Sequence, residues 1–275
     1  MVFGQGVDSL YHLVWPLALP YTMNPHSQNG LVPLLLSREG GASELLCSAI
    51  DWLIRHPAAF SKEERQDTLE ILRRTRPAMA VFAVLANRIE EALRETAINL
   101  TEDVLRQLKR ELEQAGGRMA RNFVHLLRTR APVKMVTLSL SSSVLRALEV
   151  ARELVEELYV LESWPGGEGR ETASRASSFL PSVHLLPDED LPKAVRRSDL
   201  GVLGADAVLP GGAVVSKVLS ARLAELLWQE QKPLCALATS WKFSRSGTHY
   251  VLKDADRQLF EVVPADKITY IVSES

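Results

Sequence analysis

Residues 133–163, VKMVTLSLSSSVLRALEVARELVEELYVLES, indicate the fold class of this chain. A short apolar run comes first, the serine triplet Ser141, Ser142 and Ser143 follows, and a second run, LYVLES, ends the stretch. Between them, apolar residues recur at helical spacing on one side: Leu145, Leu148, Ala151, Val155 and Leu158. This order predicts a strand, a helix that crosses over, and a second strand parallel to the first.

The same alternation continues through the rest of the C-terminal half. The apolar runs SVHLL, LGVLGA and PLCALAT are separated by the helical segments RETASRASSFL, DLPKAVRRS and SKVLSARLAELLWQEQK. Short apolar runs that alternate with amphipathic helices are typical of a parallel sheet covered on both faces. We therefore expect an α/β fold with an open sheet.

The N-terminal half has a different rhythm. Residues 42–129 show the helical period and almost no strand pattern; Ser61 and Glu64 have the spacing of a capping box, and Pro77 suits a first helical turn. These features predict an N-terminal helical bundle. The expected division is an arm and helical domain at residues 1–130 and an α/β domain with a ligand pocket at residues 131–275, with the Gly- and Pro-rich residues 1–33 as the arm.

Composition excludes several classes of function. The formal net charge of -2 gives no electrostatic reason to expect a nucleic acid or an anionic membrane as partner. The two cysteines indicate a reduced, cytoplasmic protein, and the apolar segment Leu10 to Pro20 fits neither a signal peptide nor a membrane span. The six histidines form no metal-binding spacing, so we expect no metal and no cofactor.

Three segments follow apolar runs and precede helices: Ser139–Ser143, Glu162–Arg170 and Gly204–Lys217. In open parallel sheets, ligands bind beyond the carboxyl ends of the strands, so these segments are candidates to line one pocket. The candidate ligand-binding residues within them are Ser141, Ser142, Glu162, Gly166, Gly167, Glu168, Gly169, Arg170, Ser216 and Lys217.

Each candidate also has a structural interpretation. The serines either bind an anion at a helix N-terminus or simply cap the helix. The glycines of PGGEGRE either admit a ligand close to the backbone, with Arg170 as a phosphate partner, or form a turn; they do not make a GxGxxG fingerprint. Asp206 either moves a proton, if burial raises its pKa, or belongs to a turn before Gly211 and Gly212.

Ordered motifs along residues 38–275 resemble one family, which unites the α, β and δ regulatory subunits of translation initiation factor 2B with methylthioribose-1-phosphate isomerase and ribose-1,5-bisphosphate isomerase. Gly204-Ala205-Asp206, the Gly211-Gly212 turn and SKVLS are similar to the family's GAD, glycine turn and NKIGT. SWPGGEGR resembles the factors' SRPxxEGR, and TLSLSSSVLRALEVA resembles their THAYSRVVLRVLEAA type of segment. GGASELLCSAIDWL, RPAMAVFAVLANRI and the factor-like ATSWKF complete the resemblance.

The resemblance implies a helical N-terminal domain, a Rossmann-like sheet domain of the CoA-transferase type, and dimerisation through the C-terminal half. In the family's isomerases a cysteine and the aspartate of GAD carry the proton transfers. Asp206 matches that aspartate, whereas the cysteine position falls on Ser139, which has no apparent base.

Other family positions differ as well. Gly40 and Trp164 stand where the motifs have arginine, Ser216 replaces an asparagine, and Leu219 replaces a glycine. Each change removes a phosphate contact or crowds the ligand. We therefore expect a homodimeric regulatory binder of a phosphorylated sugar or nucleotide. An aldose-ketose isomerase that uses Asp206 and Ser139, and an interaction subunit with a vestigial pocket in a larger assembly, remain as alternatives; whether the chain is an enzyme stays open.

Overall fold

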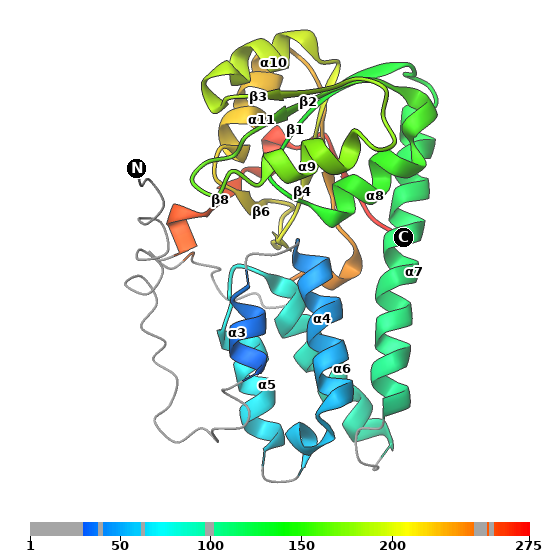
Figure 1. The fold of residues 1–275 in the computed structure, drawn as a ribbon, viewed down its shortest axis with the longest axis vertical. Coiled ribbons are helices and arrows are strands. Elements are labelled where there is room, and N and C mark those ends of the chain that lie inside the picture. The colour runs from blue at the N-terminus through cyan, green and yellow to red at the C-terminus, as the bar shows by residue number, and fades with distance from the viewer. Residues whose placement is uncertain (1–29, 38–40, 62–63, 97–101, 245–251, 253–255) are drawn as a thin grey trace, which may run out of the picture.

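The computed structural model describes residues 30–37, 41–61, 64–96, 102–244, 252 and 256–275, so most of the predicted arm lies outside the described residues. Within them, a helical part lies beneath a part built around a sheet, and one long helix runs beside both (Figure 1). Both predicted classes of structure are therefore present, in the predicted order.

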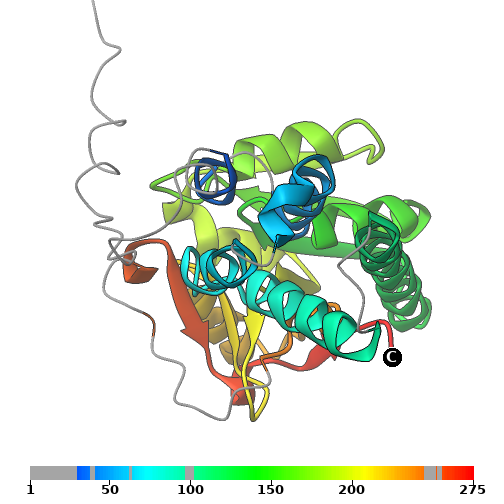
Figure 2. The ribbon, with the colours of Figure 1, turned by 90° about the horizontal axis from the view of Figure 1, so that it is seen from below.

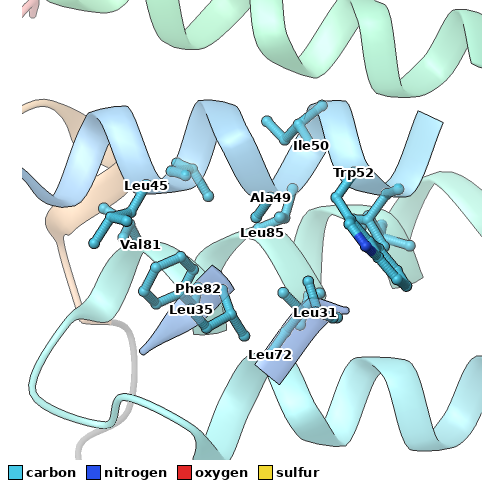
Figure 3. Packing of buried hydrophobic residues seen from close by; sticks show 14 of the residues in the cluster. Leu31, Leu35, Leu45, Ala49, Ile50, Trp52, Leu72, Val81, Phe82 and Leu85 are labelled. Carbon is cyan, nitrogen blue, oxygen red and sulfur yellow. The ribbon is translucent and has the colours of Figure 1, made fainter. Parts of the chain in front are cut away.

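The helical part packs around one apolar core. Its helices are α3 (Leu31–Leu35), α4 (Ala42–Arg55), α5 (Arg65–Arg74), α6 (Ala80–Thr96) and α7 (Glu102–Leu127), with a 3-10 turn at Pro57–Phe60. Figure 3 shows Phe82 and Leu85 of α6 facing side chains of α3 and α4. Phe82, Leu85 and Ile89, which the sequence places on one helical face, are fully buried. The helical bundle prediction is confirmed, and Figure 2 shows its helices side by side from below.

Short polar contacts fix where these helices begin. The Ser61 hydroxyl accepts a hydrogen bond from the Glu64 amide at 3.2 Å, one step before α5. The Glu44 carboxylate likewise accepts the Gly41 amide at 3.0 Å at the start of α4. Such bonds satisfy amide groups that a helix leaves unpaired in its first turn. Pro77, expected in the first turn of α6, lies instead in the turn that precedes this helix.

Helix α7 belongs to both cores. The residues of α7 up to Ala115 pack in the helical core through Leu105, Leu108, Leu112 and Ala115. Met119, Ala120, Phe123 and Leu127, in its second half, pack against the sheet. At about 1.5 Å per residue, this 26-residue helix spans about 39 Å, long enough to serve both parts.

The sheet of the C-terminal half has six parallel strands in the order β3-β2-β1-β4-β7-β9. Their bounds are β1 (Val133–Leu138), β2 (Val155–Leu161), β3 (Val183–Leu186), β4 (Leu200–Gly204), β7 (Leu234–Leu237) and β9 (Tyr270–Val272). The sequence order of the strands reverses at β1, which lies between β2 and β4. The predicted open parallel sheet is confirmed.

Helices cover both faces of this sheet. On one face, α7, α8 (Ser142–Val150) and α9 (Gly169–Ala176) pack on Met135, Val160 and Val202. On the other, α10 (Leu191–Arg197) and α11 (Ser220–Gln229) pack on Val136 and Leu203. Because alternate residues of a strand point to opposite faces, Met135 and Val136 serve different cores, as a doubly covered sheet requires.

Two predicted helix bounds in the C-terminal half are wrong. Helix α8 ends at Val150 and a 3-10 turn covers Arg152–Leu154, so Val155 and Leu158 lie on β2 and not on the helix. Their apolar side chains satisfy a helical period and a buried strand equally well, and only pairing with β1 distinguishes the two.

The second correction concerns Ser216 and Lys217, which were expected to begin a helix. They end strand β6 (Val214–Lys217), which pairs antiparallel with β5 (Ala207–Val208) and β8 (Phe260–Val263) in a small second sheet. Helix α11 begins only at Ser220. The partner strand β8 is more than forty residues away in the sequence, so the local sequence around Ser216 does not predict that β6 is a strand.

The described helices include no candidate for a membrane span, since none of them is both long enough and apolar enough.

Truncation of Phe123 to alanine should destabilise the protein by about 3–5 kcal/mol, because Phe123 is fully buried between α7 and the sheet. Urea unfolding followed by circular dichroism measures the loss. The exposed α7 residue Gln114 supplies the matched control, Gln114→Ala, with an expected change within about 0.5 kcal/mol. Equal, small effects for both variants would contradict the packing described for α7.

Candidate functional site

The carboxyl ends of β1 and β4 meet the small sheet at a small, partly open cavity. Its lining includes Ser139 and Ser141 after β1, Gly204 and Asp206 at the end of β4, and residues of β6 and of the helical part. The cavity measures about 30 Å³, enough for about one water molecule and too small for a sugar phosphate. The complete lining is Ala42, Leu138, Ser139, Leu140, Ser141, Gly204, Ala205, Asp206, Ser216, Lys217 and Lys242.

Backbone hydrogen bonds hold Asp206 from two sides. Its amide donates to the Val215 carbonyl at 2.8 Å, and its carbonyl accepts the amide of Ala80, the first residue of α6, at 3.0 Å. Asp206 therefore joins the sheet part to a helix of the helical part. These bonds use only backbone atoms, so the carboxylate remains available to the cavity.

The Asp206 carboxylate is the least satisfied acid of the site. Among the described residues, no hydrogen bond to its side-chain oxygens is found, and the partly buried residue lines the cavity. Desolvation raises the pKa of Asp206, and this effect outweighs Lys242, Arg76 and Lys217, whose charges lower the pKa. The sequence allowed either a proton-transferring residue or a turn residue here, and the geometry provides the desolvated environment that the first role needs.

Lys242 is a buried cation that sequence reasoning missed. It is 2% exposed, on the 3-10 turn Ser240–Lys242, and its ammonium group donates to the Ser143 hydroxyl at 3.3 Å. Burial lowers the pKa of Lys242, whereas the charge of Asp206 opposes that shift.

The neighbouring Trp241 anchors the turn in the helical core, where the guanidinium of Arg88 lies 3.9 Å from the centre of the Trp241 ring.

Lys217 is occupied by a carboxylate of the loop that follows β2. Its Nζ lies 2.5 Å from Oε1 of Glu168. The other oxygen of that carboxylate, Oε2, is buried without a hydrogen-bond partner among the described residues. The two predicted site residues Lys217 and Glu168 are therefore neighbours, but they form an ion pair with each other.

The loop that carries Glu168 is tightly constrained. A side chain at Gly169 would place its Cβ 1.8 Å from the Leu161 carbonyl oxygen, and one at Gly166 would meet the Glu168 carboxylate at 2.4 Å. Gly167 adopts a positive φ of 69°. These glycines serve the close approach of backbone and side chains within the protein itself.

Arg170 and Glu162 form an ion pair at 2.6 Å and do not line the cavity. Trp164 stands at a family arginine position and is 56% exposed. Its indole nitrogen also donates a hydrogen bond to Glu162, at 3.0 Å.

The Asp188 carboxylate, which the sequence did not indicate, accepts hydrogen bonds from the amides of Ser163 and Trp164, each at 2.8 Å. It lies on the 3-10 turn after β3 and fixes the start of the loop.

The candidate serines have mainly structural contacts. The Ser141 hydroxyl caps α8 by accepting the Val144 amide at 3.3 Å, and a Cβ at Gly204 would lie 2.2 Å from it. The Ser216 hydroxyl donates to the Gly204 carbonyl at 2.9 Å. Ser142 does not line the Asp206 cavity.

Ser139 is held through its backbone. It has a positive φ of 61°, its amide donates to the Ser163 hydroxyl at 2.6 Å, and its carbonyl accepts the Thr172 hydroxyl at 2.6 Å. No basic side chain among the described residues accepts a hydrogen bond from its hydroxyl. The hydroxyl therefore lacks the activation that a nucleophile or acid-base serine needs.

Two further family positions can be placed. Leu219 has a φ of 84°, a left-handed conformation that favours the glycine of the related motifs. Gly40, at the other arginine position, lies outside the described residues. No group of three or more His, Cys, Asp or Glu side chains in the described part of the chain is arranged to hold a metal ion.

The variant Asp206→Asn should gain stability relative to the parent as the pH rises from about 4 to 7. The unfolded parent ionises Asp206 near its ordinary pKa of 3.8, whereas the folded parent keeps the proton to higher pH, so ionisation destabilises the parent across this interval. Each unit by which the pKa is raised corresponds to about 1.4 kcal/mol. Urea unfolding of both proteins at several pH values gives the difference; a difference independent of pH would contradict a raised pKa.

Comparisons with known proteins place the chain among relatives of translation initiation factor 2B. A relative from Dictyostelium discoideum, translation initiation factor eIF2B subunit alpha, is 30% identical over 97 residues, 35% of this chain and 29% of the relative. A relative from Pyrococcus abyssi, a putative translation initiation factor eIF-2B subunit 2-like protein, is 24% identical over 247 residues, 72% of this chain and 87% of the relative. Its counterpart from Pyrococcus furiosus is 27% identical over 128 residues, 46% of each protein, so the chain aligns with less than half of two of these three relatives.

Solved structures share the fold at low sequence identity. The Pyrococcus horikoshii translation initiation factor eIF-2B has a TM-score of 0.73 at 21% identity, with 92% of this chain and 96% of that chain covered. The tetrameric eIF2B-beta2-delta2 complex of Chaetomium thermophilum has a TM-score of 0.67 at 18% identity, covering 89% and 87%. The 5-methylthioribose 1-phosphate isomerase of P. horikoshii has a TM-score of 0.63 at 19% identity, covering 89% and 82%.

The model of one protein family matches residues 42–274, which include most of the helical core, the core residues of the sheet and every residue of the Asp206 cavity. Together with the predicted motifs and the shared fold, this match shows that the chain belongs to the initiation factor 2 subunit family, IF-2B.

Proposed function

We propose that this protein is a regulatory member of its family that binds a small phosphorylated sugar or nucleotide at the Asp206 cavity without converting it. The observation that carries the proposal is the Asp206 carboxylate, which is desolvated, has no hydrogen-bond partner among the described residues, and lines a cavity with Lys217 and Lys242. A carboxylate withdrawn from water without a partner is costly, which supports a role in binding hydroxyl groups of a ligand.

The two lysines supply the complementary charge for a phosphate. Among the described residues, Lys242 has one weak hydrogen-bond partner, the Ser143 hydroxyl, and Lys217 is paired with Glu168. Because a phosphate offers three acceptor oxygens, it can replace the Glu168 carboxylate on Lys217. In this proposal the Glu168 side chain blocks the site. The cavity of about 30 Å³ becomes large enough for a ligand only after this side chain has left Lys217.

Ser139 is the reason for proposing binding without turnover. A serine hydroxyl is far less acidic than a thiol, and among the described residues no base contacts it. A single carboxylate can remove a carbon-bound proton and return it to the neighbouring carbon, but the two sugar oxygens must also exchange a proton, and Ser139 stands where the related isomerases have the cysteine as a second group. This is the chemical argument against the isomerase alternative.

We also propose that the protein works as a dimer or in a larger assembly. The solved structures that share its fold include a tetrameric complex, and that observation favours this second role. Mass photometry at nanomolar concentration tests it directly, with a single monomer peak as the contradicting result.

A thermal-shift screen with ribose 5-phosphate, ribose 1,5-bisphosphate, methylthioribose 1-phosphate and nucleoside monophosphates should identify at least one stabilising ligand. A ligand at about one hundred times its Kd adds about 2.7 kcal/mol to the free energy of unfolding. NMR spectra of each mixture should contain no ketose signals. Ketose formation would make Asp206 a catalytic residue and the protein an isomerase; no shift with any compound would favour an interaction subunit with a vestigial pocket.

Glu168→Gln should bind the stabilising ligand about tenfold more tightly than the parent, because a neutral amide competes less well for Lys217. Asp206→Asn should bind it more weakly, since it loses a charged acceptor. The exposed residue Glu189 provides the control, Glu189→Gln, with unchanged affinity. Isothermal titration calorimetry measures all four proteins, and weaker binding by Glu168→Gln would show that Glu168 contacts the ligand instead of excluding it.

A further inference from the structure

A second, larger cavity lies between the helical part and the sheet part. It measures about 620 Å³, within the range of small-molecule sites. Helices α4, α7, α8 and α9 form its walls together with Thr239, and it shares none of the residues that line the Asp206 cavity. We call it the interdomain groove.

Contacts between helices hold the groove in shape. The Arg146 guanidinium on α8 donates to the Glu113 carbonyl of α7 at 2.8 Å, and a Cβ at Gly116 would lie 2.7 Å from the same nitrogen. On the opposite side, Arg175 of α9 donates to Glu44 of α4 at 2.8 Å. Arginines from the sheet part therefore tie both helical walls.

The lining of the groove is an apolar surface with charged groups around it. Leu112, Leu145 and Phe179 contribute apolar side chains from three different segments. A buried polar atom adds a specific requirement: Thr239 is 3% exposed, and its hydroxyl has no hydrogen-bond partner among the described residues. A buried hydroxyl without a partner is an unusual cost, which a polar atom of a ligand in the groove would relieve.

The balance of charge indicates the kind of ligand. Glu44 is neutralised by Arg175, and it also accepts the Gly41 amide. The remaining charged side chains of the lining are Glu113, Glu149 and Arg146, which leave one net negative charge. Charge complementarity therefore favours a ligand with a positive group over an anion.

We propose that the interdomain groove binds an organic cation with an apolar body. The ammonium group lies between the carboxylates of Glu113 and Glu149, the apolar body covers Leu112, Leu145 and Phe179, and a polar atom pairs with the Thr239 hydroxyl. This site is independent of the phosphorylated ligand proposed for the Asp206 cavity, since its residues and its charge preference both differ.

Two probes with the same ring system and opposite charge test the proposal: 1-naphthylmethylamine and 1-naphthoate. Cys47 lines the groove and is partly exposed, whereas Cys235, the other cysteine of the chain, is buried in the sheet. Modification by N-ethylmaleimide, followed by mass spectrometry of each cysteine, should therefore occur at Cys47. The amine should slow modification at least about tenfold at saturation, and the naphthoate should not.

Isothermal titration calorimetry of the amine provides the second measurement, which does not depend on thiol reactivity. The double variant Glu113→Gln/Glu149→Gln should lose about fivefold or more in affinity, the range expected for two partly exposed charge contacts. Both residues are exposed, so the fold should persist. Glu230→Gln, an exposed change just after α11 and outside the groove, should leave the affinity unchanged.

Equal protection by the naphthoate, equal affinity of the double variant, or no binding of the amine at millimolar concentration would each overturn the proposal. None of these results depends on whether a phosphorylated ligand binds near Asp206.

Discussion

Helix α7 is buried in two cores at once. Its first half completes the helical core and its second half covers one face of the sheet. Because neither set of apolar residues can be exposed without losing several kcal/mol, the two parts of the chain are held at a fixed separation. The Asp206 cavity lies where the two parts meet, with Ala42 of the helical part in its lining. The domain boundary predicted at residue 130 therefore comes just after a helix that packs in both parts.

Desolvation governs the chemistry of the site. Asp206 and Lys242 have opposite charges, yet desolvation shifts the pKa of each toward its neutral form. Both groups lose most of their hydration, and their mutual attraction does not fully compensate for that loss, as is common for buried ions. Glu157, near the opposite end of the strands, behaves differently. It accepts hydrogen bonds from Lys134 and Tyr159, which lower its pKa to about 2.

Much of the fold could be predicted from the sequence because strand, helix and turn signals in residues 133–239 are local. The position of Asp206 at the end of a strand, beside the Ser139 segment, followed from the same signals. What failed depended on distant partners: Val155 and Leu158 needed pairing with β1, and Ser216 and Lys217 needed β8. Lys242 was not identified as a site residue from the sequence, although a lysine within the apolar ATSWKF segment is a visible signal. Asp188 was not identified either, because the two amides that Asp188 binds lie 24 and 25 residues earlier in the chain. Whether the predicted ligand-binding residues bind a ligand stays a prediction.

The serine triplet at the start of α8 separates the Asp206 cavity from the interdomain groove. Ser141 lines the Asp206 cavity, Ser142 and Ser143 line the interdomain groove, and Ser143 accepts the hydrogen bond of Lys242. If a ligand in one cavity shifts this turn of α8, it changes the affinity of the other cavity, and the linkage is reciprocal: whatever factor the first ligand imposes on the second, the second imposes on the first.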